Sequence, residues 1–199
     1  MDVAGSVGSG PARINGIVMR VFIGIELPAN IQEGLSGVQR ELRPAAPAAR
    51  WVATESAHLT LKFLGEITEQ RAEEVHQAMT GLTWKPFQIT VKGIGFFPGT
   101  RSPRVFWAGL HAPTLEALSG RIDSKMETFG FEKERRSYRA HITLARAKRG
   151  PLEAALVTAA SQFEETDFGS FNVDRCFLYQ SELTPNGPVY TKLREFLLS

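Results

Sequence analysis

The chain has 199 residues, of which 43% are hydrophobic and 22% are charged, and its formal net charge is +2. This length suits one domain with its own core, and the composition excludes a disordered or collagen-like chain. The single cysteine excludes an intramolecular disulfide and a zinc site built from several thiolates, and it favours a reducing, cytoplasmic location.

Residues 1–18 are rich in Gly, Ser and Ala, and they lack the basic start and continuous apolar stretch of a secretory signal. We expect them to form a disordered extension, and we expect residues 19–199 to form a single bilobal domain. No apolar run approaches the ~20 residues that span a bilayer, so no membrane partner is expected.

The first ordered elements alternate between short apolar segments and segments with helical spacing. Residues 20–27 predict a buried strand, and a helix is predicted at 28–42 because a proline opens it. After a Pro/Ala loop, strands are predicted at 50–52 and 58–64, and Thr68 is a candidate N-cap for the next helix. We expect these segments to form a βαβ-like unit.

The rest of the chain contains more predicted strands than helices. In chain order, its predicted elements are a strand pair at 87–97 and 104–110, a helix at 113–129, a strand at 141–145, a helical segment at 151–163, and strands at 172–180 and 189–196 around a turn at 184–188. Several of these strands are joined by short loops. The pattern therefore predicts an α+β fold with antiparallel sheets.

One four-residue pattern, His-apolar-Thr-Leu, occurs twice. It reads HLTL at 58–61 and HITL at 141–144, 83 residues later, which is about half of the expected ordered chain. We therefore expect two pseudo-symmetric lobes around a central cleft. Because alternate residues of a strand face the same way, each motif presents its histidine and threonine together and turns its apolar residues to the core.

This duplicated pattern suits hydrolysis of a cyclic phosphodiester, which requires a base for water, an acid for the leaving oxygen and donors for the phosphoryl oxygens. Imidazole can fill either proton-transfer role near neutral pH, and threonine hydroxyls can bind phosphate. One such histidine is usually structural, but packing does not favour an inward polar pair twice. The candidate catalytic residues are His58 and His141, and the candidate substrate-binding residues are Thr60 and Thr143. No metal and no other cofactor is expected, since no ligand cluster has metal spacing.

Basic residues gather around the second motif. Residues 133–149 contain seven Lys or Arg and one acid, which favours an anionic ligand. Strict alternation turns Arg146 away from the cleft unless the strand bends, whereas Lys62 shares the parity of His58 and is either a site residue or a solvent-facing lysine. The aromatic residues that suit either base stacking or the core are Phe63, Phe97, Trp107 and Tyr138.

These motifs resemble those of the two-histidine phosphoesterases, and among them the bacterial and archaeal RNA 2′,3′-cyclic phosphodiesterases once called 2′,5′ RNA ligases. The resemblance covers roughly residues 19–198. It is carried by RVFIGIELP at 20–28, HLTLKFLG at 58–65, HITLAR at 141–146, and the segments 93–98, 103–107 and 181–190.

The resemblance implies hydrolysis of a terminal 2′,3′-cyclic phosphate to a 2′-phosphomonoester by two α+β lobes without a metal. It assigns His58 as proton donor to O3′ and His141 as proton acceptor from water, a division that the residues alone do not decide. Thr60 and Thr143 would hold the phosphate. The implied partner is RNA with a cyclic phosphate end, tRNA fragments among the candidates, and no obligatory protein partner is evident.

Three other functions would use the same residues. Joining or cleavage of 2′,5′-linked RNA is the approximate reverse of ring opening, and product analysis separates it from hydrolysis. A non-catalytic nucleotide-binding module would bind phosphate without turnover, which one assay decides. A cyclic phosphodiesterase for small nucleotides is distinguished by comparing a cyclic-phosphate RNA with a cyclic mononucleotide.

Overall fold

The computed structural model describes residues 18–184 and 187–198. The strands are β1 (Val18–Glu26), β2 (Arg50–Trp51), β3 (His58–Thr68), β4 (Phe87–Phe97), β5 (Val105–His111), β6 (His141–Arg146), β7 (Asp167–Val173), β8 (Arg175–Thr184) and β9 (Gly187–Leu197). The α-helices are α1 (Ala29–Leu42), α2 (Glu69–Thr80), α3 (Pro113–Thr128) and α4 (Ala154–Ala160), with short 3-10 turns at 43–45, 54–56 and 161–163.

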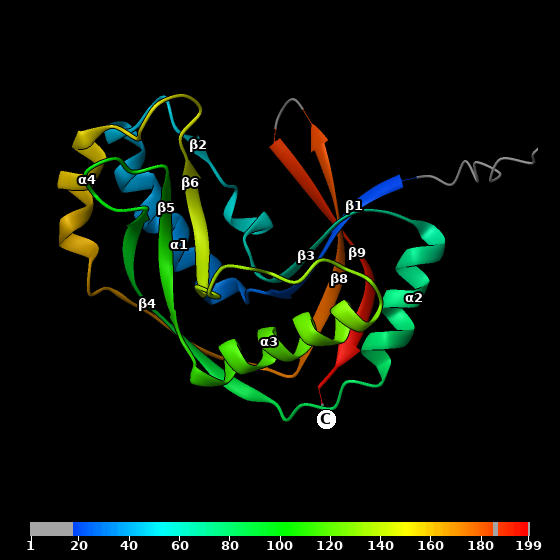
Figure 1. The fold of residues 1–199 in the computed structure, drawn as a ribbon. Coiled ribbons are helices and arrows are strands. Elements are labelled where there is room, and N and C mark those ends of the chain that lie inside the picture. The colour runs from blue at the N-terminus through cyan, green and yellow to red at the C-terminus, as the bar shows by residue number, and fades with distance from the viewer. Residues whose placement is uncertain (1–17, 185–186, 199) are drawn as a thin grey trace, which may run out of the picture.

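Two antiparallel sheets form the framework of the molecule (Figure 1). The strand order is β3-β1-β8-β9 in the first sheet and β2-β6-β5-β4-β7 in the second. This arrangement confirms the α+β class with antiparallel sheets. The expected βαβ-like unit is wrong, because β1 and β3 pair antiparallel and β2 joins the other sheet.

The two sheets repeat one arrangement. Outward from each histidine strand, the first sheet reads β3-β1-β8-β9 and the second reads β6-β5-β4-β7, with β2 added beside β6. In each case the first two strands are linked through a helix, α1 between β1 and β3 and α3 between β5 and β6. The strand order therefore agrees with two related lobes.

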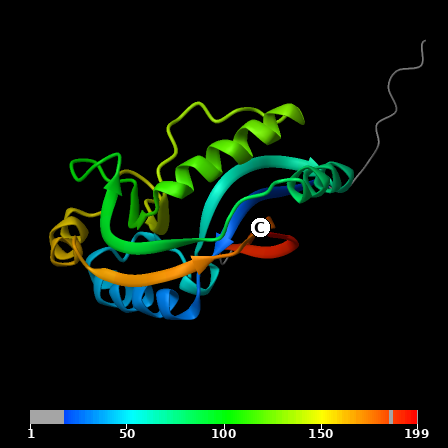
Figure 2. The ribbon, with the colours of Figure 1, turned by 90° about the horizontal axis from the view of Figure 1, so that it is seen from below.

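The two linking helices are exchanged between the sheets. α1 follows a strand of the first sheet but contacts β7 of the second, whereas α3 follows a strand of the second sheet but contacts β3 of the first. Figure 2 shows α1 and α3 on opposite sides of the strands. The exchange interlocks the two lobes, so that neither histidine strand is supported by its own lobe alone.

Most element boundaries agree with the sequence predictions, but β3 continues past the predicted end at 64 to Thr68, and two later elements also differ. The helix expected at 151–163 is α4 followed by a 3-10 turn, and the strand expected at 172–180 is wrong because the chain passes from β7 to β8, and so between sheets, at Asp174. The expected N-terminal extension lies outside the described residues except for Val18, which opens β1. The turn expected at 184–188 also lies partly outside them.

Candidate active site

The two repeated motifs occupy the same place in their sheets. His58 is the first residue of β3 and His141 is the first residue of β6, and both imidazoles are half-buried. The apolar residues of the motifs are almost fully buried, with exposed fractions of 4% or less, as alternation predicts. The Cα atoms of β3 and β6 approach one another within 8 Å although the strands belong to different sheets.

A β-bulge interrupts each motif just after its threonine. In β3, Lys62 pairs with Ile23 and Thr60 pairs with Gly24, so Leu61 is the extra residue. In β6 the register against β5 shifts in the same way, which leaves Leu144 extra. One extra residue reverses the side to which the following residues point.

The bulges correct the expectations for two charged residues. Lys62 is neither a site residue nor solvent-facing, since it is 6% exposed and pairs with Asp123 in the interior. Arg146 returns to the face of His141, and its Nη2 donates to Thr143 Oγ1 at 3.2 Å, which confirms the alternative in which the strand bends. Phe63, at the place in β3 that Arg146 has in β6, is 59% exposed.

A buried polar side chain from an exchanged helix binds the carbonyl of each bulged residue. Ser119 Oγ on α3 donates to Leu61 O at 2.9 Å, and Gln39 Nε2 on α1 donates to Leu144 O at 3.1 Å. Both side chains belong to residues no more than 5% exposed. Leu144 O also accepts from Val52 N at 2.9 Å, so Gln39 gives this carbonyl a second partner, and each of the two side-chain bonds holds a bulged residue in place.

The two histidines are oriented by the same backbone contact. Nδ1 of His58 lies 3.0 Å from Ser56 O, and Nδ1 of His141 lies 2.7 Å from Arg139 O. A carbonyl oxygen only accepts hydrogen bonds, so each Nδ1 must carry a proton. Nε2 of each ring is therefore the atom left to give or take a proton.

Burial lowers the pKa of both histidines below the ordinary value of 6.5, and the backbone contacts only partly oppose it. The Arg146 guanidinium lowers both pKa values further, because its positive charge opposes protonation of either ring. Burial also lowers the pKa of Arg146 itself. Both imidazoles are thus harder to protonate than a free imidazole, and the arginine charge contributes to this for each.

Aromatic rings surround His58. Its ring stacks on Phe22 with centroids 4.4 Å apart, meets the Tyr190 ring edge-on at 4.5 Å, and lies 5.9 Å from Tyr179. These rings come from β1, β9 and β8 and form a small cluster with Phe177, separate from the main core. No motif in the sequence predicts these rings. The alternation of β1, which sends Phe22 away from Val21 and Ile23, is the one sequence feature that indicates a second apolar face.

The surroundings of His141 are more cationic. Its ring meets Phe97 edge-on at 5.0 Å, and the Arg139 guanidinium carbon lies 5.7 Å from the centre of the same phenyl ring. Trp107 lies beside Phe97 and extends across Gly95, where a Cβ would approach the indole to 2.3 Å. Glycine at position 95 is thus required for Trp107 to pack beside Phe97 next to the second histidine.

The lone cysteine, Cys176, is not part of the site. Cys176 is buried, and burial raises the pKa of its thiol to about 12, in agreement with a structural residue. In residues 18–184 and 187–198, no three His, Cys, Asp or Glu side chains are grouped so that they could hold a metal ion. No helix in this part of the chain has the length and apolar character needed to cross a membrane.

Comparison with known sequences gives one consistent family. The family model described as LigT like Phosphoesterase matches residues 25–107 and 110–190. An RNA 2′,3′-cyclic phosphodiesterase of Methanocaldococcus jannaschii is 35% identical over 178 residues, which cover 89% of this chain and 100% of that protein. A protein of the same name from Thermotoga maritima is 35% identical over 182 residues, which cover 89% and 94%.

Solved structures share the fold. A crystal structure of a Thermus thermophilus protein has a TM-score of 0.74 and 30% identity, covering 90% of this chain and 98% of the other. Escherichia coli LigT complexed with 3′-AMP has a TM-score of 0.74 and 27% identity, covering 92% and 99%. The similarity therefore extends over both lobes and includes both histidine strands.

Proposed function

Because the chain belongs to the LigT-like phosphoesterase family, we propose that it hydrolyses the 2′,3′-cyclic phosphate at the end of an RNA to a 2′-phosphomonoester. The names of its relatives support the reaction. The observation that carries the proposal is the pair of His-x-Thr strands, each with Nδ1 held by a backbone carbonyl and Nε2 left for chemistry.

In the proposed reaction, water attacks phosphorus and the P–O3′ bond breaks while the P–O2′ bond remains. His141 Nε2 takes the proton of the attacking water, and His58 Nε2 gives a proton to the departing O3′. Thr60, Thr143 and Arg146 donate hydrogen bonds to the other phosphoryl oxygens, where negative charge accumulates. Each of these steps uses only side chains, so the proposed reaction is independent of metal.

The surroundings of His58 support one half of this division of roles. The Phe22 ring is stacked on His58, and a π face attracts a cation, so this contact favours the imidazolium form that an acid requires. Arg146 opposes a positive charge on both rings and does not distinguish them. The Phe22 contact thus supports His58 as the acid, while the assignment of His141 as the base follows the family resemblance.

The test is incubation of an oligonucleotide with a 2′,3′-cyclic phosphate end in the presence of excess EDTA, followed by identification of the product. We expect complete conversion to the 2′-phosphomonoester without a divalent ion. A 3′-phosphomonoester would contradict the proposed bond cleavage. Loss of turnover that a divalent ion restores would contradict metal independence, and binding without turnover would favour the nucleotide-binding module.

A further inference from the structure

The segment between α3 and β6, residues 129–140, is here called the anchored loop. It contains neither helix nor strand, yet polar contacts fix it along its length. Figure 1 shows it running back from the end of α3 across the strands of the first sheet to reach β6. It therefore connects the helix that supports β3 to the strand that begins with His141.

A buried ion pair forms the centre of this anchorage. Lys62 Nζ donates to Asp123 Oδ1 at 2.5 Å and to the carbonyl of Glu132 at 2.6 Å, and Asp123 Oδ1 also accepts from Glu134 N at 3.2 Å. The side chains of Lys62 and Asp123 are only 4% and 12% exposed. A pair this well buried is costly to break, because either partner alone would leave an uncompensated charge.

Two further contacts hold the ends of the anchored loop. The Arg71 guanidinium on α2 donates to Phe129 O. Tyr138 OH donates to Thr60 O at 3.0 Å, which ties the loop to the first histidine motif. The loop is therefore held by α2, α3 and β3 before any substrate binds, and its backbone is preorganised.

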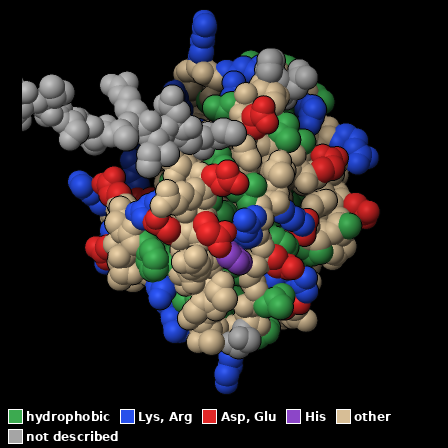
Figure 3. Space-filling model, turned by 90° about the vertical axis from the view of Figure 1, so that its right-hand side faces the viewer, with side chains coloured by type: hydrophobic (Ala, Val, Ile, Leu, Met, Phe, Trp, Pro, Cys, Tyr) green, Lys and Arg blue, Asp and Glu red, His purple; other side chains and the backbone are tan. Residues whose placement is uncertain are grey.

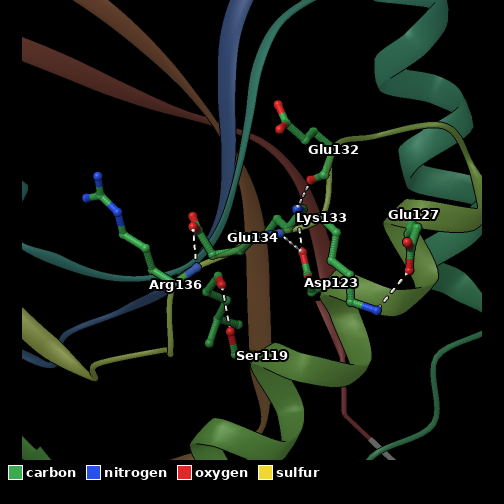
Figure 4. Close-up of polar contacts among 9 residues, drawn as sticks. Ser119, Asp123, Glu127, Glu132, Lys133, Glu134 and Arg136 are labelled. Carbon is green, nitrogen blue, oxygen red and sulfur yellow. Dashed lines mark hydrogen bonds and ion pairs between the residues drawn. The ribbon is translucent and has the colours of Figure 1, made fainter.

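The anchorage uses mainly the backbone of the loop, and it leaves the charged side chains of the loop, acidic and basic, exposed. Glu134 accepts a hydrogen bond from Arg136 N at 3.1 Å, and the Arg136 side chain extends away from the network (Figure 4). Within residues 18–184 and 187–198, no carboxylate lies within ion-pair distance of Arg136 or Arg139. Arg135 pairs with Glu132, but both side chains are more than 80% exposed, so this pair holds the arginine weakly.

This row of positive charge reaches the candidate active site. Arg139 lies over Phe97, which touches His141, and its own carbonyl orients that imidazole. By contrast, the side of the molecule that bears α2 mixes acidic and basic side chains (Figure 3). The segment that leads into the second histidine strand, residues 129–140, thus carries four basic and two acidic side chains and a formal net charge of +2.

We propose that the anchored loop is a preformed binding site for RNA phosphates upstream of the reacting cyclic phosphate, with Arg135 and Arg136 as its principal contacts. The inference rests on the proposed function and names the substrate class more closely, because such a site binds a polynucleotide more tightly than a mononucleotide. Flexible arginines on a fixed backbone can follow a single-stranded phosphate chain at little cost in loop ordering.

The experiment compares two substrates, a cyclic-phosphate oligonucleotide and the 2′,3′-cyclic mononucleotide with the same terminal base. kcat/KM is measured at about 50 and about 200 mM salt for wild type, R135Q/R136Q, and a control, R40Q/R121Q, that removes the same charge elsewhere. For a single strand, each phosphate contact adds ~0.7 to the slope of log binding constant against log salt concentration. Losing two contacts should therefore make the fall in kcat/KM over this fourfold rise in salt about sevenfold smaller.

We expect that reduction for R135Q/R136Q on the oligonucleotide only, with wild-type rates on the mononucleotide and wild-type slopes for the control. An unchanged slope in R135Q/R136Q would overturn the inference, as would an equal effect in the control or an equal loss on the mononucleotide. A wild-type protein that turns over neither substrate would instead mark failure of the proposed function.

Discussion

The strands β3 and β6 present their histidines with the same local geometry in different surroundings. Each histidine opens its strand, binds a carbonyl two residues earlier through Nδ1, and precedes a bulge whose carbonyl a buried side chain of the exchanged helix binds. Beyond this repeat the lobes diverge. β3 places its histidine among three aromatic rings, whereas β6 places its histidine beside arginines.

The comparison separates two tasks that a catalytic pair must perform. The repeated backbone contacts fix the tautomer and direction of each ring, and these requirements are the same for an acid and a base. The neighbouring rings differ between the lobes, since they come from β1, β8 and β9 around His58 and from β4 beside His141. In the proposed reaction, one duplicated scaffold supplies both proton-transfer groups.

The largest expected effect comes from removing either imidazole. His58→Ala and His141→Ala should each lower kcat by at least ~10², since general acid or base catalysis typically contributes 10² to 10⁴. Steady-state kinetics on the cyclic-phosphate oligonucleotide checks this, with circular dichroism to show that both variants fold. The comparison would fail if a folded variant kept near wild-type turnover.

Arg146 lowers the pKa of both histidines, so its loss should shift both pKa values in the same direction. Removing this positive charge makes each imidazolium more favourable, so both pKa values rise in Arg146→Gln. We expect wild-type kcat/KM to peak below pH 6.5 and the whole bell-shaped profile to shift to higher pH in the variant. We also expect kcat/KM to fall about tenfold or more as a phosphate donor is lost.

The control for this variant is Arg149→Gln, which removes a positive charge beyond the end of β6. Its profile should keep the wild-type position. A shift of only one limb in Arg146→Gln would show that the arginine acts on one ring, and the account of a shared cation would then be wrong.

The smallest expected effects concern the side chains that bind the bulges. Ser119→Ala leaves the Leu61 carbonyl with one partner fewer, and Gln39→Leu does so for two carbonyls, those of Leu144 and Val52. Each change should cost about 1 kcal/mol or more of the free energy of unfolding. Gln39→Leu should also lower kcat/KM, since the β6 bulge sets the direction of Arg146. Ser119→Ala should spare turnover more, because the corresponding β3 position is Phe63.

Denaturant unfolding and steady-state kinetics on both variants make this measurement. If the two variants lost the same free energy of unfolding and the same kcat/KM, the two bulges would not have separate consequences. Gln39→Met serves as a matched uncharged variant of similar size, in which the lost donor should again remove the bond to Leu144 O.

The sequence predicted the features that depend on short-range pattern. The fold class, the two histidine strands and the inward direction of Leu59, Leu61, Ile142 and Leu144 all follow from apolar alternation and a repeat. Thr68 was also confirmed as an N-cap, because its hydroxyl accepts from Arg71 N as a helix start requires.

The features that the sequence did not predict depend on distant partners. Alternation fails after the leucine of each motif because that leucine is the extra residue of a bulge, and the bulge at Leu144 is bound by Gln39, 105 residues away. The burial of Lys62 was not predicted for the same reason, because Lys62 directly follows a bulge. The rings around His58 lie on strands that only the folded sheet brings together, so no spacing in the sequence predicts them.

The central claim, that His58 is the acid and His141 the base, is tested most directly by changing the leaving group. A nitrophenolate departs without receiving a proton, so a nitrophenyl phosphodiester should largely restore His58→Ala relative to wild type on the same substrate. It should not restore His141→Ala, because the attacking water still needs a base. Rescue of His141→Ala in place of His58→Ala would contradict the proposed division of roles.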